Sequence, residues 1–420
     1  MSEATLSDHA LLDLVQRQTL SYFWDFGHPA SGMARERSNP DANYDYLDTV
    51  TSGGTGFGIM AMLAGAARGF LPRGDVLKRV ATITAFLEGM ERYHGVLPHF
   101  ISGATGRVIP FSPQDDGGDL VETAYLMAGL LCARQFFSGA APDEAALRAA
   151  IDRLWHGVEW NWYRRDGGNV LFWHWSPRHG WAMNHAITGW NECLITYVLA
   201  AASPTHAIPP TVYHDGWTAS PVFRNGRSYH HIPLPLGPPQ GGPLFFSHYS
   251  FLGLDPRGLR DRYADYWAQN RAHTLINRAH CIANPHGFEG YGPRCWGLTA
   301  CDGDAGYGAF CPENDRGVIA PTAALSAMPY TPDESMAALR HFYEELGAKI
   351  WQRHGFVDAF NATRGWIAGS NLAIDQGPIV VMIENHRSGL LWDLFMSGPE
   401  VRVGLRRLGF ESPWLETAES

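Results

Sequence analysis

Acidic residues interrupt a few otherwise apolar stretches of the 420-residue sequence, and they are its clearest candidates for chemistry. The first group comprises Asp115, Asp116, Asp119 and Glu122 in SPQDDGGDLVETAYL. Residues three or four apart share a helix face, so neighbouring members would lie together if a helix begins early. Helix capping explains one or two of them, with Asp116 as the simplest cap. We therefore expect the group, with Asp115 and Asp119 foremost, to form part of a site.

A further acidic residue, Glu192, lies in the apolar stretch HAITGWNECLITYVLAAAS. Such surroundings disfavour the charged form of a carboxyl group, which raises its pKa toward the value that a general acid needs near neutral pH. A hydrogen-bonded structural glutamate is the alternative. Asp375 and Glu384 form a third group in IDQGPIVVMIENHRSG, where Arg387 offers Glu384 an ion-pair partner. For this group a structural role and a functional role are both open.

Aromatic residues are frequent, with 15 Trp, 16 Tyr and 21 Phe. The C–H faces of sugars stack on Trp and Tyr, and sugar hydroxyls need Asp, Asn, Arg or His partners. We expect Trp155 and Trp160 to be core residues, whereas the better stacking candidates lie in loop-rich stretches: Trp173, Trp175, Trp181, Trp190 and Trp296, with His185 beside them. Aromatic loops near carboxyl groups meet the needs of glycoside hydrolysis. That reaction uses one carboxylic acid at the glycosidic oxygen and one carboxylate for water or the anomeric carbon.

A mainly helical fold must position these residues. Apolar periodicity predicts about eleven helices and few strands, with residues 169–175 (NVLFWHW) as the best strand candidate. Some helical windows are amphipathic and others apolar nearly all round; the first kind covers 75–92, 143–160, 257–280 and 332–347, and the second 52–68, 118–137, 182–201 and 375–387. This alternation predicts an all-α (α/α)-barrel, an inner ring within an outer ring, whose long loops carry the site. Two unrelated helical domains are the alternative.

Composition and local pattern exclude several classes of protein. The formal net charge of −10 argues against nucleic-acid binding, which needs a basic surface. No apolar run predicts a membrane span, and the N-terminus lacks a signal-peptide pattern, so we expect a cytoplasmic protein, or a periplasmic one if a leader was removed. No linker divides residues 1–420, so a single domain is expected. Six cysteines are too few for a disulfide scaffold in a chain of this length. No metal-binding motif occurs, so neither a metal nor another cofactor is expected. The segment DGDAG at 302–306 is expected to be a turn.

Several long motifs occur in an order that resembles a known family. They are DDGGDLVETAYLMAGLL, GWNECLITYVLA, WGLTACDGDAGYGAF, GVIAPTAALSAMPYTPDESMAALRHFYEEL, HGFVDAFN and IDQGPIVVMIENHRSGLLWDLFM. Over roughly residues 10–410 the chain is similar to the bacterial glycoamylase-like domain, which includes glycoside hydrolase family 144 and the C-terminal part of cyclic β-1,2-glucan synthases. The resemblance implies an (α/α)6-barrel and, for family 144, inverting hydrolysis of β-1,2-glucan or sophorooligosaccharides. It does not imply starch as the substrate.

The resemblance also indicates catalytic residues. Carried over by motif, the candidate acids fall on Asp115, Asp119 and Glu192. We expect Glu192 to be the proton donor, Asp115 the base or water-positioning carboxylate and Asp119 a tuning or binding group, although the first two roles could be exchanged. The expected partner is an oligo- or polysaccharide bound by Trp173, Trp175, Trp181, His185, Trp190, Trp296, Asp302, Tyr307 and Glu384. Transglycosylation, hydrolysis of another glucoside and non-catalytic glucan binding are the alternatives, and endo or exo action and the oligomeric state are left open.

Overall fold

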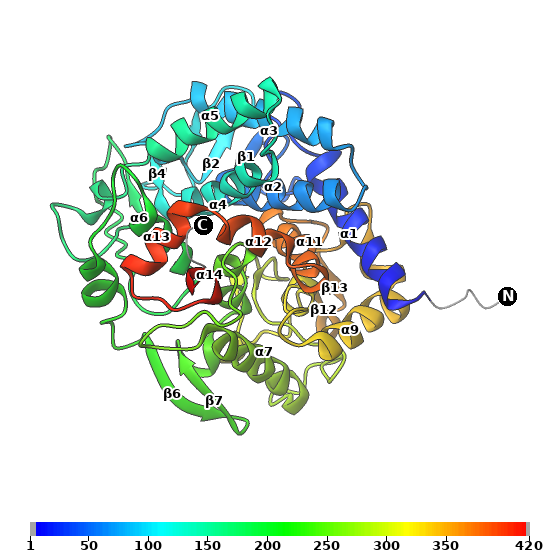
Figure 1. Cartoon of the computed structure of the whole chain (residues 1–420). Coiled ribbons are helices and arrows are strands. Elements are labelled where there is room, and N and C mark those ends of the chain that lie inside the picture. Colours follow the sequence, from blue (N-terminus) through cyan, green and yellow to red (C-terminus); the bar gives the residue numbers. More distant parts are fainter. Residues whose placement is uncertain (1–5, 417–420) are drawn as a thin grey trace.

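The computed structural model describes residues 6–416, whose regular elements are mostly helices (Figure 1). The α-helices in chain order are α1 (Asp8–Trp24), α2 (Ser52–Ala67), α3 (Arg73–Gly89), α4 (Leu120–Phe136), α5 (Pro142–His156), α6 (Leu194–Ala202), α7 (Tyr266–Ala283), α8 (Pro321–Leu325), α9 (Pro332–Arg340), α10 (Gly347–Ile350), α11 (Ala373–Arg387), α12 (Leu390–Met396), α13 (Pro399–Arg407) and α14 (Pro413–Glu416). The helix-rich class predicted from periodicity is therefore confirmed.

The strands are short and antiparallel. They are β1 (Thr49–Thr51), β2 (Phe100–Ser102), β3 (Val108–Ile109), β4 (Gly118–Asp119), β5 (His174–Trp175), β6 (Arg224–Tyr229), β7 (Ile232–Leu236), β8 (Ala300–Cys301), β9 (Gly308–Ala309), β10 (Trp351–Gln352), β11 (Gly355–Phe356), β12 (Phe360–Asn361) and β13 (Trp366–Ile367). The largest sheet among the described residues contains three strands, in the order β1-β2-β3. Of the strand predicted at 169–175, only β5 forms, and it pairs with β4 so that Asp119 lies opposite His174.

The two predicted kinds of helix are found. α2 and α4 are buried along nearly their whole length, and they pack against each other, while α11 packs against α2. The amphipathic α3 and α5 contact α2 and α4 respectively and lie beyond them at the periphery (Figure 1). Burial of apolar surface in this way is the main favourable contribution to folding. The buried helices thus form a rigid base for the residues at their ends.

Some predicted helix boundaries are wrong, and one of these errors concerns the site. The helix predicted over 182–201 begins only at Leu194, as α6. Asn184 and Gly189 have left-handed backbone conformations, with φ of 45° and 80°, which a right-handed helix cannot include. Glu192 therefore lies on the turn that precedes α6 rather than inside a helix. Near the C-terminus, α12 and α13 are separated at Gly398, because Pro399 begins a new helix.

The close approach of α2 and α4 depends on two glycines and gives a stability prediction. A Cβ on Gly129 would lie 2.3 Å from the backbone oxygen of Gly56, and one on Gly56 would lie 2.2 Å from the backbone oxygen of Tyr125. Backbone on both sides cannot move without separating the helices, so we expect Gly129→Ala to lower the free energy of unfolding by about 3 kcal/mol. Urea unfolding followed by circular dichroism measures this change.

Gly74→Ala is the matched control for that substitution. Gly74 lies in the first turn of α3, and a Cβ there would have no atom within 4 Å. Since alanine forms helices better than glycine does, the free energy of unfolding of the Gly74→Ala variant should stay the same or rise by up to about 1 kcal/mol. Equal stability of the two variants would contradict the proposed packing of α2 on α4.

Within residues 6–416, no helix combines the length and the apolar character needed to cross a bilayer.

Candidate active site

A cavity of about 370 Å³ lies where several buried helices begin. Thr51 directly precedes α2, Glu122 and Tyr125 lie in the first turns of α4, Glu192 lies just before α6, and Ile374 lies in the first turn of α11. The aromatic residues of the lining are Tyr44, Phe100, Phe111, Tyr125, Trp173, Phe245, Tyr249 and Tyr307. A cavity of this size, with aromatic walls and a few charged groups, is typical of a small-ligand site.

Glu192 is the carboxyl group that the sequence singled out, and it lines this cavity. The turn that carries it is fixed because the Ser250 hydroxyl donates to the Glu192 backbone oxygen at 2.5 Å. Burial, with the nearby charges of Glu122 and Asp119, raises the pKa of Glu192 to about 7. A partly exposed carboxyl with such a pKa can hold a proton at neutral pH and deliver it to a ligand.

Asp119 is the N-cap of α4, a role that the sequence assigned to Asp116. Its Oδ1 accepts from the backbone N–H groups of Val121 (3.0 Å) and Glu122 (2.9 Å), which are otherwise unpaired at a helix start. Its Oδ2 accepts from Trp173 Nε1 at 3.0 Å and contacts His99 Nδ1 at 3.2 Å. Four donors thus occupy this carboxylate, so it holds its neighbours in place rather than being free for a ligand.

His99 lies between two carboxylates of this cluster. Its Nδ1 contacts Asp119, and its Nε2 lies 3.9 Å from Glu122 Oε1. Burial alone would lower the pKa of His99, but Glu122 and Asp119 outweigh that effect and raise it to about 9. The imidazole is therefore charged at neutral pH. Phe111 stacks on it, with ring centroids 4.5 Å apart, and is itself 55% exposed at the cavity.

Glu122 also lines the cavity, although the sequence did not select it among the catalytic residues. Its Oε2 accepts from the backbone N–H of Gly53 at 2.7 Å and from the Thr51 hydroxyl at 3.3 Å. Burial raises the pKa of Glu122, while His99 and the Gly53 N–H lower it. These bonds leave Oε1 available to a water molecule or ligand. The feature of the sequence that could have identified Glu122 as a site residue is its place in the acidic group SPQDDGGDLVETAYL.

Asp115 lies outside the lining of the cavity. It is 8% exposed, and its Oδ1 lies 3.4 Å from His174 Nε2. Burial and the charge of Asp119 raise the pKa of Asp115 to about 7. Asp115, Asp119 and Glu122 thus all act on His99, and of these three Glu122 is the one that lines the cavity. Because α4 begins at Leu120, Asp115 and Asp119 precede the helix and do not share a helix face with Glu122.

The predicted sugar platform is only partly assembled. Trp173 and Tyr307 line the cavity, and His185 stacks on Trp173 with centroids 4.8 Å apart. Trp175 and Trp181 lie outside the lining: Trp175 packs against Trp162 and His94, and Trp181 against Tyr163 and Phe172.

The assignment of Trp190 and Trp296 to the sugar platform is wrong. Trp190 is 3% exposed and packs among Trp217, Phe223 and Tyr266, while Trp296 is fully buried. Side chains enclosed in the core have no face left for a sugar. Trp155 and Trp160 are core residues, as predicted.

Glu384 is also misplaced by the sequence-based assignment. It lies by a separate surface pocket, where Arg68 binds it through Nε (2.7 Å) and a second nitrogen (3.1 Å). Arg387, the predicted partner, instead donates to Asp13 and Gln16. The bidentate pair with Arg68 gives Glu384 a structural role.

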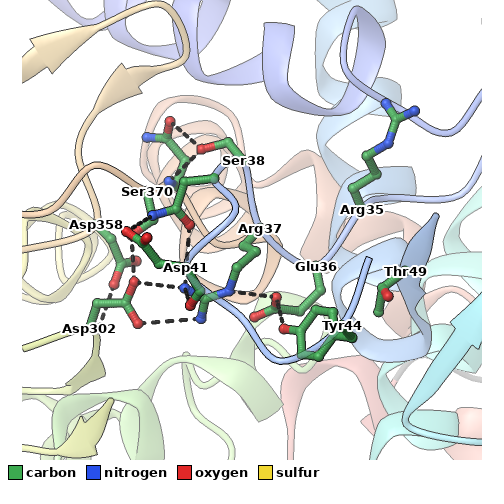
Figure 2. A network of polar contacts seen from close by, with 12 residues as sticks. Arg35, Glu36, Arg37, Ser38, Asp41, Tyr44, Thr49, Asp302, Asp358 and Ser370 are labelled. Atoms are coloured by element: carbon green, nitrogen blue, oxygen red, sulfur yellow. Dashed lines mark hydrogen bonds and ion pairs between the residues drawn. The ribbon is translucent and has the colours of Figure 1, made fainter. Parts of the chain in front are cut away.

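Another wall of the cavity contains charged residues that sequence reasoning missed. Arg37 and Glu36 line the cavity and form an ion pair at 2.9 Å, and the hydroxyl of Tyr44 donates to Glu36. Figure 2 shows Arg37 between Glu36 and Asp302, whose carboxylate it contacts at 3.1 Å. Asp302 therefore supports the wall through Arg37. The polar segment RERSNPDANYDY gave no sign of this role, because its partner lies 265 residues away.

Comparisons with known proteins show which family this chain belongs to. Residues 184–399 match the family model Glycoamylase, described as "Putative glucoamylase". The exo β-1,2-glucooligosaccharide sophorohydrolase (non-reducing end) of Parabacteroides distasonis is 44% identical over 424 residues, which cover 96% of this chain and 58% of that protein. This chain therefore spans little more than half the length of that curated relative.

Two solved structures are also similar. The endo-β-1,2-glucanase of Chitinophaga pinensis, in complex with sophorotriose and glucose, is 54% identical, with a TM-score of 0.95 and coverage of 98% of this chain and 100% of that chain. The β-1,2-glucanase of Parabacteroides distasonis is 43% identical, with a TM-score of 0.93, and covers 96% of this chain and 60% of that chain.

Proposed function

The chain belongs to the glycoamylase family, and from this premise we propose that it is a glycoside hydrolase that cleaves β-1,2-glucan or sophorooligosaccharides. The observation that carries the proposal is Glu192, a carboxyl group with a pKa of about 7 that faces an aromatic-lined cavity also lined by Glu122. The activities of the Parabacteroides and Chitinophaga relatives support the choice of β-1,2-linked substrates.

The proposal includes the architecture. We infer that the whole chain is one catalytic domain and that its helices close into an (α/α)6-barrel, with the cavity at the end where α2, α4, α6 and α11 begin. The packing of the buried α2 against α4 and α11, with α3 and α5 outside, supports an inner and an outer ring.

In the proposed mechanism, Glu192 donates its proton to the glycosidic oxygen as the bond breaks. Glu122 accepts a proton from the attacking water, since its Oε1 is directed away from the bonds that fix Oε2. Sequence predicts Asp115 for the second role, and we assign it to Glu122 because Glu122, unlike Asp115, lines the cavity. Asp119, which accepts from the Glu122 backbone N–H, and the charged His99 beside Glu122 then hold the base in place. The reaction is proposed to invert the anomeric configuration.

The aromatic lining suits the substrate. Phe111 and Tyr307, at 55% and 56% exposed, present ring faces beside the cavity on which glucose units can stack. Arg37 and Glu36 provide charged partners for sugar hydroxyls at the same cavity.

The pH dependence of kcat/KM follows from these assignments. Glu192 must be protonated, so activity should fall as the pH rises through about 7, the pKa of that group. Glu122 must be ionised, so activity should fall as the pH is lowered through its raised pKa. A bell-shaped profile of kcat/KM on sophorooligosaccharides is expected, and a rate that keeps rising above pH of about 9 would contradict the role of Glu192.

The substrate class is tested by product analysis. With linear β-1,2-glucan we expect new reducing ends and shorter chains, and with maltooligosaccharides or starch no reaction. Changed chain lengths with a constant number of reducing ends would instead indicate transglycosylation. Activity on α-glucans with none on sophorooligosaccharides would overturn the proposed substrate.

A further inference from the structure

Two buried aspartates lie behind the Arg37 wall of the cavity. Asp358 lies between β11 and β12, Asp375 lies in the first turn of α11, and each is 3% exposed. The two carboxyl groups interact, and the charge of Asp358 raises the pKa of Asp375. Two ionised carboxylates cannot hydrogen-bond to each other, so a bond between them needs one neutral carboxylic acid.

One oxygen of each carboxyl group has a partner, and the other does not. Asp358 Oδ2 accepts from the backbone N–H of Asp302 at 2.7 Å, and Asp375 Oδ1 lies 3.4 Å from the Tyr249 hydroxyl. The other two oxygens, Asp358 Oδ1 and Asp375 Oδ2, are buried without a hydrogen-bond partner in the part of the chain that the structure describes. A buried polar atom without a partner is costly, and one proton held between these two oxygens satisfies both.

The surrounding charges favour retention of that proton. Arg37 forms ion pairs with Glu36 and Asp302, and within residues 6–416 neither Asp358 nor Asp375 forms one. Burial, followed by the charge of a neighbouring carboxylate, raises the pKa of both members of the pair. The titratable and charged groups that face the pair are Tyr22, Arg37, Tyr249, Cys301, Asp302 and Tyr307. Arg37 is the one cation in this set.

The pair connects two parts of the cavity wall. On one side, Asp358 accepts a hydrogen bond from the backbone N–H of Asp302. The Asp302 carboxylate in turn accepts from Arg37 and from the Ser370 hydroxyl (Figure 2). On the other side, Asp375 is attached to α11 and contacts the hydroxyl of Tyr249. Arg37 and Tyr249 both line the cavity.

We propose that Asp358 is a positioning residue of the active site, which shares one proton with Asp375 and so ties the Asp302–Arg37 segment to the start of α11. The shared O–H···O bond is charge-assisted and short by nature, which makes the connection stiff. The effect on catalysis rests on the proposed function, whereas the shared proton itself does not.

Infrared difference spectroscopy at pH of about 7 tests the shared proton. The spectrum of wild-type protein minus Asp358→Asn should contain the carbonyl band of one protonated carboxylic acid, because the asparagine amide donates to Asp375 and leaves it ionised. Asp315→Asn is the matched control. Burial would raise the pKa of Asp315, but hydrogen bonds from His280, the Gly317 N–H and Tyr291 lower it, so its difference spectrum should lack the band. Absence of the band for Asp358→Asn would overturn the proposal.

Kinetics on sophorooligosaccharides test the positioning role. Asp358→Asn can keep both hydrogen bonds, so KM and kcat should stay within about threefold of wild type. Asp358→Ala leaves the Asp302 N–H and the Asp375 carboxyl without partners, so KM should rise about tenfold or more, with a smaller change in kcat. Equal losses in both variants, or an unchanged KM for Asp358→Ala, would overturn the proposal. If the alanine variant does not fold, the kinetics of the asparagine variant and the infrared band still test the proposal. If the wild-type protein is inactive on glucan, the proposed function is refuted, but the infrared spectrum still tests the shared proton.

Discussion

Replacing Glu192 by glutamine should lower kcat on β-1,2-glucan by about 10²- to 10⁴-fold, the range that general acid catalysis contributes. Glutamine has nearly the same size and keeps the turn before α6, whose contact with Ser250 uses the Glu192 backbone oxygen. The variant should therefore fold normally, bind oligosaccharide with little change and lack only the proton for the leaving oxygen. Steady-state kinetics with a reducing-end assay, together with a melting curve, measure both properties.

The control for this substitution makes the same chemical change elsewhere. Glu384→Gln alters a buried glutamate that lies outside the cavity and pairs with Arg68. It should leave kcat within about twofold even though it weakens an ion pair and lowers stability.

Leaving-group chemistry separates loss of the acid from general damage. An aryl sophoroside whose phenol leaves without protonation should be cleaved by Glu192→Gln at a rate close to that of the wild type. If the variant loses the same factor on both substrates, Glu192 is not the proton donor.

Replacing Glu122 by glutamine should give the second-largest loss, about 10²-fold or more in kcat, because the attacking water loses its base. This loss should persist with the aryl sophoroside, since water attack is needed whatever the leaving group. The charge of Glu122 also contributes to the raised pKa of Glu192. Its removal should lower that pKa, so the alkaline limb of the residual activity should move to lower pH.

Asp115→Asn is the comparison that tests the choice of base. Asp115 lies outside the cavity lining, so its replacement should cost less activity than that of Glu122 and should leave the alkaline limb closer to its wild-type position. A larger loss for Asp115→Asn than for Glu122→Gln would return the role of base to Asp115.

Glu192 and the acidic group that contains Glu122 could be found from sequence because each conflicts with its surroundings. Glu192 and the group from Asp115 to Glu122 lie in or beside apolar runs, where a carboxyl group is costly without a purpose or a partner. The family resemblance seen in the motifs is confirmed as well. The sequence could not rank the acids within the group, because the capping of α4 by Asp119 and the position of Glu122 at the cavity depend on the exact residue at which the helix starts.

The tryptophans show where sequence reasoning fails. Trp173, Trp190 and Trp296 all lie in Gly-rich, irregular segments, but only Trp173 reaches the cavity. Burial of a loop residue is decided by contacts with distant segments, such as Trp190 with Tyr266, which local pattern does not contain. Arg37 and Glu36 were missed for the same reason, since Arg37 is held by the distant Asp302.

The configuration of the first product tests the account most directly. Proton NMR during hydrolysis of linear β-1,2-glucan should show new reducing ends that appear first as the α-anomer, because water attacks opposite the leaving group with Glu122 as base and Glu192 as acid. The β-anomer as the first product would contradict the two-carboxylate inverting mechanism, and the absence of new reducing ends would contradict hydrolysis of this glucan altogether.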